Sequence, residues 1–316
     1  MADLLDRKLV FVTGKGGTGK TTIAAALAWL AAARGKKTLV CEVDAKGDLA
    51  NFYETGPTEF EEREVAPRLW AMSMDTEASL KQYLSLQLKL PLVAKIGPLA
   101  KMFDFVASAA PGVKEIVTVG KLCWEVRERH YDFIVVDASA SGHIVSQLAA
   151  PQAINQLVQV GLVRQQTGWM LDILGDAATT GLVVVATPAE MPVSETLELT
   201  ERVRAETNVD LAAVVVNRVL PELFGRGEEE VFDRLTGSEP LRRPVEERLG
   251  GSMTPLLDAA RLTVTMRRSR TEHLERLRDA IDPSIPMLYM PYLFFRAHGL
   301  RATHQIADAL SAELGY

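Results

Sequence analysis

Eight consecutive residues near the start of the chain, Gly14 to Thr21, constrain its fold more than any other feature. Their sequence is GKGGTGKT; it follows the short apolar run Lys8–Thr13 and precedes the alanine- and leucine-rich segment Ile23–Ala33. The apolar run predicts a strand and the alanine-rich segment predicts a helix. A Gly-x-x-x-x-Gly-Lys-Thr spacing between a strand and a helix predicts a phosphate-binding loop (P-loop).

Each residue type in this loop suits a bound triphosphate. Glycines let backbone N–H groups converge on the phosphates, and the start of the helix adds its dipole. Lys20 is expected to reach the β- and γ-phosphates, and the Thr21 hydroxyl to ligate Mg²⁺. The predicted nucleotide-binding residues of the loop are Gly14, Gly16, Gly17, Thr18, Gly19, Lys20, Thr21 and Thr22.

The rest of the chain continues the alternation of strands and helices. Further apolar runs predict strands at Thr38–Val43, Phe133–Val136, Leu182–Ala186, Ala212–Val216 and Met287–Met290. Continuous apolar strands separated by helices indicate a mostly parallel sheet with both faces covered. We therefore predict an α/β fold of the P-loop type, with residues 1–316 forming a single domain.

Three segments depart from that alternation. Residues 78–129 and 151–180 contain no strand pattern and predict a helical subdomain inserted in the chain. Residues 221–253 are acidic and then rich in Gly and Pro, which predicts a surface excursion. Ligands of open α/β sheets bind at the carboxyl ends of the strands, so the residues just beyond the ends of the predicted strands should surround one site. These residues are Asp137, Pro188, Asn217 and Pro291.

Composition argues against several kinds of partner. The residues are 47% hydrophobic and 24% charged, with a net charge of −6, so no basic field favours nucleic acid. Residues 1–8 resemble no secretion signal, and the apolar runs are too short to span a bilayer, so we expect a cytoplasmic protein. The two cysteines, Cys41 and Cys123, form no CxxC pair; we expect core thiols and no zinc.

A second lysine, Lys15, directly follows the first glycine of the loop. With it, the run GKGGTGKTT resembles the signature of the deviant Walker A ATPases, the class that contains MinD, ParA, the nitrogenase iron protein and the arsenite-pump ATPase. In that class the extra lysine crosses a dimer interface to the partner's nucleotide. The resemblance therefore implies a dimer and a catalytic role for Lys15 beside Lys20.

Residues 44–49, DAKGDL, resemble the switch I motif Asp-Pro-Ala-x-x-Leu of the arsenite-pump ATPase family, with Ala45 in place of the proline and Lys46 also departing from the motif. The resemblance gives Asp44 the role of orienting the attacking water and places Asp48 in the same switch. A carboxylate at a strand end beside the γ-phosphate can polarise that water.

Residues 137–143, DASASGH, resemble switch II of the same family. Asp137 is then expected to hold Mg²⁺ through a water, and Gly142 to report the presence of the γ-phosphate. Asn217 resembles the residue that contacts adenine, and Pro291 belongs to a segment similar to the loop that closes over the base. Adenine is favoured over guanine because NRVL, at 217–220, is not the Asn-Lys-x-Asp guanine motif.

These segments together resemble the group of arsenite-pump ATPases and tail-anchored-protein targeting factors, in its single-domain bacterial form. The resemblance implies ATP and Mg²⁺ as ligands, hydrolysis to ADP and phosphate, and either a homodimer or a heterodimer with a paralogous ATPase. Three cellular roles stay open: a targeting or chaperone factor for membrane proteins, using an apolar groove from residues 84–106; the energy-coupling subunit of an anion or arsenite transporter; and a MinD- or ParA-like positioning ATPase.

Overall fold

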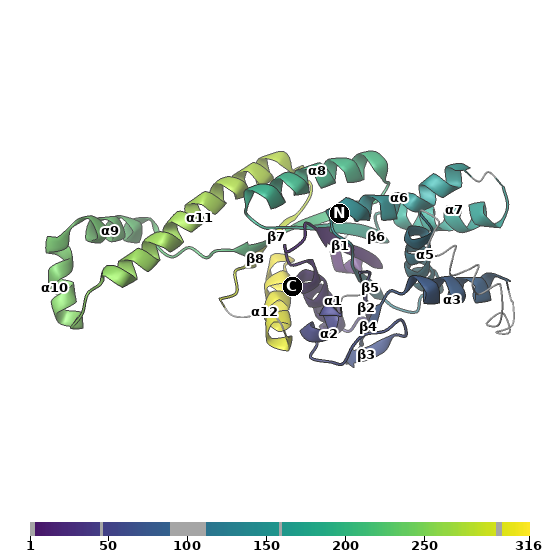
Figure 1. The fold of residues 1–316 in the computed structure, drawn as a ribbon, viewed down its shortest axis with the longest axis horizontal. Helices are drawn as coiled ribbons and strands as arrows, with labels where there is room; N and C mark the ends of the chain where they lie inside the picture. Colours follow the sequence, from purple (N-terminus) through teal and green to yellow (C-terminus); the bar gives the residue numbers. More distant parts are fainter. Residues whose placement is uncertain (1–3, 45–46, 89–111, 158–159, 295–298) are drawn as a thin grey trace.

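A computed structural model describes residues 4–44, 47–88, 112–157, 160–294 and 299–316. Eight strands form one sheet in the order β3-β4-β2-β5-β1-β6-β7-β8 (Figure 1). All neighbouring strands pair in parallel except β3 and β4, which confirms the predicted α/β class. The strands are β1 Leu9–Gly14, β2 Thr38–Glu42, β3 Arg63–Ala66, β4 Leu69–Ser73, β5 Phe133–Asp137, β6 Thr180–Ala186, β7 Leu211–Val219 and β8 Met287–Pro291.

Helices cover both faces of this sheet. Helices α1 and α12 pack on one face, and α5, α6, α7 and α8 supply core residues on the other. The helices are α1 Lys20–Ala33, α2 Asp48–Phe52, α3 Thr76–Leu88, α5 Val113–Glu128, α6 Ser141–Leu157, α7 Leu162–Gly175, α8 Glu190–Glu206, α9 Arg226–Gly237, α10 Glu239–Leu249, α11 Thr254–Ala280 and α12 Leu300–Glu313, preceded by a short 3₁₀ turn at Leu4–Asp6.

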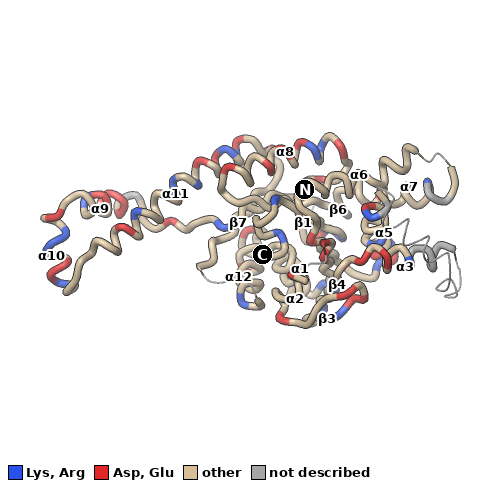
Figure 2. The backbone as a smooth tube through the Cα atoms, viewed as in Figure 1, with Lys and Arg blue, Asp and Glu red and all other residues tan. Residues whose placement is uncertain are grey.

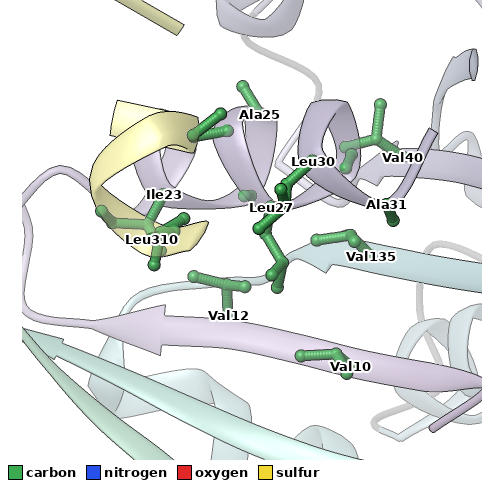
Figure 3. Close-up of a cluster of buried hydrophobic side chains, with 14 of the residues drawn as sticks. Val10, Val12, Ile23, Ala25, Leu27, Leu30, Ala31, Val40, Val135 and Leu310 are labelled. Carbon is green, nitrogen blue, oxygen red and sulfur yellow. The ribbon is translucent and has the colours of Figure 1, made fainter. Parts of the chain in front are cut away.

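Strand β1 lies in the middle of the sheet, and its side chains alternate between the two covered faces. Val10 and Val12 pack with α1, as Figure 3 shows, whereas Leu9 and Phe11 belong to the core on the opposite face. All four side chains are fully buried. Burial on both faces explains why the strand is continuously apolar, and it fixes the loop after Gly14 at the centre of the sheet.

Two strands were not predicted. β3 and β4 lie at one edge, where β4 pairs in parallel with β2 and β3 returns antiparallel through a turn at Arg68, which has a φ of 64°. β3 has no buried residue, so its sequence lacks the apolar run that identifies the central strands. A second difference concerns Asn217, which lies inside β7 rather than beyond the end of that strand.

Helices α9 and α10 and the adjoining part of α11 form an arm that projects from the sheet and its covering helices (Figure 1). The arm includes most of the predicted surface excursion at residues 221–253, which is helical. No residue of α10 is buried, and its side chains Leu241, Val245 and Leu249 are exposed. Acidic and basic residues both occur along the arm (Figure 2).

The predicted helical subdomain corresponds to the end of the molecule opposite the arm, where α3, α5, α6 and α7 lie together (Figure 1). The described parts of residues 78–129 and 151–180 are mainly helical. Residues 89–111 lie outside the described part of the chain, and with them most of the apolar stretch at 84–106. Within the described ranges, no helix is both long enough and apolar enough to cross a membrane.

Candidate nucleotide site

Glycine is required at particular positions of the loop between β1 and α1. Gly14 has a φ of 147°, and a Cβ there would lie 2.2 Å from the carbonyl oxygen of Val185 on β6. Gly17 and Gly19 have φ values of 84° and 95°, in the left-handed region. A side chain at these positions would be strained, and at Gly14 it would also separate two paired strands.

The loop delivers the chain directly into the start of α1. Lys20 is the first residue of this helix, and the preceding Gly19 provides no side-chain cap. The N–H groups of a helical first turn have no partner within the helix, so they are available to an anion. The predicted strand, loop and helix therefore form the expected kind of phosphate-binding cradle.

A cavity of about 330 Å³ opens over this cradle. From the loop and the start of α1 it is lined by Gly16, Gly17, Gly19, Lys20, Thr21 and Thr22. From the other predicted site residues it is lined by Asp44, Asp48 and Asp137. The structure thus brings three segments that are far apart in the sequence to one cavity at the carboxyl ends of β1, β2 and β5.

Thr21 and Asp137 meet at the floor of the site. The Thr21 hydroxyl donates to Oδ2 of Asp137 at 2.7 Å, whereas Oδ1 of Asp137 is buried and has no hydrogen-bond partner. Burial raises the pKa of Asp137 to about 6, with smaller opposing effects from the Thr21 hydrogen bond and the charge of Lys20. A hydroxyl beside a carboxylate oxygen without a partner is a donor set that suits Mg²⁺, which prefers oxygen ligands. These residues fit the expected metal.

Asp44 follows β2 and is exposed at the cavity. Its Oδ1 accepts a hydrogen bond of 3.3 Å from the hydroxyl of Ser139, which belongs to the predicted switch II. The carbonyl of Ser139 in turn accepts from Thr13 at the end of β1, at 2.8 Å. The two predicted switches are therefore linked to each other and to the strand that leads into the phosphate loop.

Seven predicted site residues, Pro188 among them, do not line the cavity. Lys15 forms an ion pair with Glu195 on α8. Asn217 donates from Nδ2 to the carbonyl of Thr18 at 2.8 Å, so its amide supports the phosphate loop in this structure. Gly142 is the second residue of α6, and Pro291 is the last residue of β8. Two further positions, Gly14 and the buried Thr18, shape the loop from behind.

The cavity also has lining residues that the sequence analysis did not select: Glu42, Asn51, Phe52, Ala138, Ala140 and Arg218. Glu42 ends β2, and a charged residue at the end of an apolar strand was a signal that could have identified it. Arg218 follows Asn217 and has a φ of 59°, which is unusual for a residue other than glycine. Ala138 and Ala140 lie within the predicted switch II, and no sequence pattern singles out Asn51 or Phe52.

A loop of this geometry after the central strand, with an acidic residue at the end of the neighbouring strand, places the chain among the P-loop nucleotide-binding proteins. Comparison with known proteins narrows that class. Residues 7–174, more than half of the chain, match the family described as anion-transporting ATPases. The chain belongs to this family.

Individual relatives agree with that assignment. The ATPase BagA of Mycobacterium tuberculosis is 32% identical over 225 residues, which are 68% of this chain and 66% of BagA. A protein of Aquifex aeolicus named for an arsenical pump-driving ATPase is 26% identical over 68% of this chain and 81% of its own length. The ATPase GET3 of Chaetomium globosum is 28% identical over 62% of this chain and 56% of its own length. The match spans just under two thirds of BagA.

Proposed function

We propose that this protein binds Mg²⁺ and ATP and hydrolyses ATP to ADP and phosphate. The observation that carries the proposal is the hydrogen bond between Thr21 and the buried Asp137, which has one carboxylate oxygen without a partner, directly beside a phosphate cradle. When bound, Mg²⁺ would neutralise phosphate charge. Lys20 and the first-turn N–H groups would bind the phosphates, and Asp44 would orient the attacking water.

Phosphate release by the purified protein tests this activity. We expect hydrolysis that requires Mg²⁺ and that falls at least about 100-fold in Asp44→Asn, because the carboxylate that accepts a hydrogen bond from water is removed. Binding of a fluorescent ATP analogue should persist in that variant. Asp308→Asn, an exposed change on α12, is the matched control and should retain full activity. Equal rates in the wild type and Asp44→Asn would refute the assignment of Asp44.

We further propose that ATP closes a dimer in which Lys15 reaches the nucleotide of the partner. Support comes from the position of Lys15, which lies in the phosphate loop while its side chain points to α8 instead of lining the cavity of its own chain. Sedimentation of Asp44→Asn with and without ATP should show a nucleotide-dependent dimer. Adding Lys15→Ala to this variant should abolish the dimer. The Kd of the monomer for the ATP analogue should stay within about threefold of the value for Asp44→Asn alone.

Among the cellular roles, we propose ATP-controlled binding of a hydrophobic membrane-protein segment. Leu157, the last residue of α6, and Val160, shortly before α7, are 82% and 81% exposed, in the helical region farthest from the arm. Exposed apolar side chains of this kind favour a protein or membrane-segment partner. A relative named GET3 and one named for an arsenical pump both belong to the group, so a transporter subunit is the alternative.

The cysteines bear on that alternative. Cys41 and Cys123 are both fully buried, and burial raises the pKa of each thiol far above its ordinary value. A metalloid such as arsenite binds thiolates, which these two residues do not readily form. We therefore expect arsenite to leave the hydrolysis rate unchanged.

A labelled apolar helix peptide in detergent-free buffer tests the choice. We expect ATP-dependent capture by Asp44→Asn and loss of capture when Leu157 and Val160 are both changed to Ser. Leu249→Ser, a comparably exposed apolar residue on α10 in the arm, is the matched control. Capture that does not depend on ATP, or an equal loss of capture in the control, would contradict a client site at Leu157 and Val160.

A further inference from the structure

Glu42, the last residue of β2, has a carboxylate that is held on several sides. The residue is only 2% exposed, which is rare for a glutamate. Its Oε1 accepts from the backbone N–H of Asp48 at 3.1 Å, and its Oε2 accepts from the N–H of Gly47 at 3.2 Å. The hydroxyl of Ser73 at the end of β4 also donates to Oε2, at 3.4 Å. A buried carboxylate is tolerated because these donors replace water.

The two backbone donors begin the short helix α2. Gly47 precedes that helix with a φ of 73° and supplies no side-chain cap. Helix starts leave N–H groups without partners and favour a negative charge nearby. Glu42 supplies that acceptor from the neighbouring strand, so the start of α2 is fixed to the end of β2.

This arrangement holds both ends of the segment that carries Asp44. The segment leaves β2 from the backbone of Glu42, and it reaches α2 where the side chain of the same Glu42 holds Gly47 and Asp48. The carbonyl of Glu42 also accepts from the backbone N–H of Met74, the residue after β4, at 2.7 Å. A carboxylate at this position therefore limits where Asp44 can lie.

Glu42 and Asp44 both lie at the cavity over the phosphate loop. Glu42 is paired in register with Asp137 on β5, and Glu42, Asp44, Asp48 and Asp137 all line the same cavity. Asp44 also accepts from Ser139 two residues beyond Asp137. The segment of Asp44 is thus fixed on one side by Glu42 and contacts switch II on the other.

We propose that Glu42 is a positioning residue for ATP hydrolysis: its carboxylate holds Gly47 and Asp48, at the start of α2, against the end of β2 and thereby limits the place of Asp44 relative to Asp137. The proposal rests on the proposed ATPase function. Glu42 itself does not contact the water or the phosphates in this role; it acts through Asp44. The two backbone N–H groups are accepted by different carboxylate oxygens, so an amide, which has one acceptor oxygen, does not offer the same pair of acceptors.

The test separates the rate of hydrolysis from nucleotide binding. Glu42→Gln keeps the size of the side chain and replaces one acceptor oxygen by an NH₂ group, which cannot accept from Gly47 or Asp48. At saturating ATP we expect kcat to fall about 10- to 100-fold, as for other misplaced catalytic groups, while the Kd of a non-hydrolysable ATP analogue stays within about threefold. Each hydrolysis rate is divided by the concentration of nucleotide-binding sites, which is measured by titration with that analogue.

Two controls complete the design. Glu61→Gln, an exposed acid just before β3, should match the wild type. Glu42→Asp keeps the charge but shortens the reach, so kcat should again fall with the analogue Kd preserved. A merely structural role would lower the number of titrated sites or weaken the analogue, with an unchanged rate per site, and that result would overturn the proposal.

Amide hydrogen exchange in the wild type covers the case in which Glu42→Gln does not fold. Slow exchange at the N–H groups of Gly47 and Asp48 with the ATP analogue bound is expected, and exchange at unprotected rates would overturn the proposal. If the wild type hydrolyses no ATP, the proposed function and the role of Glu42 both fail. If the wild type is active and Glu42→Gln is equally active, only the role of Glu42 fails.

Discussion

Asp137 is a buried acidic residue at the nucleotide site, and its ionisation affects the stability of the folded protein. Burial raises its pKa from 3.8 to about 6, so the folded protein binds this proton more tightly than the unfolded chain does. The tighter proton binding stabilises the folded state. This stabilisation is fully present below pH 3.8 and is lost as the pH rises through about 6. At neutral pH the buried charge therefore opposes folding in the metal-free protein.

Asp137→Asn should accordingly raise the free energy of unfolding at pH 7.5 by about 1 to 3 kcal/mol, without Mg²⁺ or nucleotide. Urea denaturation measures this difference, which should shrink as the pH falls from 6 toward 4. The same variant should lose Mg²⁺-dependent hydrolysis, since a carboxylate oxygen is replaced. A variant less stable than the wild type at pH 7.5 would show that the charge is compensated in the free protein.

Lys15 provides a second prediction for one residue. Its ion pair with Glu195 holds the side chain against α8 of its own chain, and both side chains are about 30% exposed. Pairs this exposed contribute at most about 1 kcal/mol. Glu195→Ala in the Asp44→Asn background should therefore lower the ATP concentration at half-maximal dimer up to about fivefold, measured by sedimentation. Glu201→Ala, exposed on the same helix, should leave it unchanged; a higher requirement in Glu195→Ala would contradict the idea that the pair restrains Lys15.

Pairing of β1 with β6 depends on the absence of a side chain at Gly14. A Cβ there would lie 2.2 Å from the Val185 oxygen, at a φ of 147°. We expect Gly14→Ala to cost about 3 kcal/mol or more in urea denaturation, because backbone must move. Gly16→Ala is the matched control: a Cβ at this residue would have no atom within 4 Å, and the cost should stay below about 1 kcal/mol. Equal costs would mean that the loop adjusts freely.

The secondary-structure elements that could be predicted are those whose sequence pattern lies within one short stretch of the chain. The strand, loop and helix around residues 8–33 follow from an apolar run, a glycine spacing and an alanine-rich segment that are adjacent in sequence. The β3–β4 edge was missed because β3 is exposed and lacks an apolar pattern. The charge of Glu42 at the end of an apolar strand marks the residue, but its partners Gly47, Asp48 and Ser73, and hence its role, follow from the fold and not from a motif. The contact of Thr21 with Asp137 spans 116 residues, and only the resemblance anticipated that both act on one metal.

At the scale of the molecule, stability should be lowest in the arm. No residue of α10 is buried, whereas β1 is buried along its whole length. Local opening needs less free energy where few apolar contacts are broken. Amides of α10 should exchange at least about 100-fold faster than those of β1, with α12, which has five buried residues, in between. Protection of α10 equal to that of the sheet would indicate that another molecule covers the arm.

The arm also affects how the protein moves through solvent. Because α9, α10 and part of α11 extend well beyond the body of the molecule (Figure 1), the chain has a larger frictional coefficient than a sphere of equal mass. A monomer will elute early from a gel-filtration column and tumble slowly, as a bigger particle would. Elution volume alone would therefore suggest a dimer where none exists, and light scattering or sedimentation equilibrium, which report mass, gives the true count of chains.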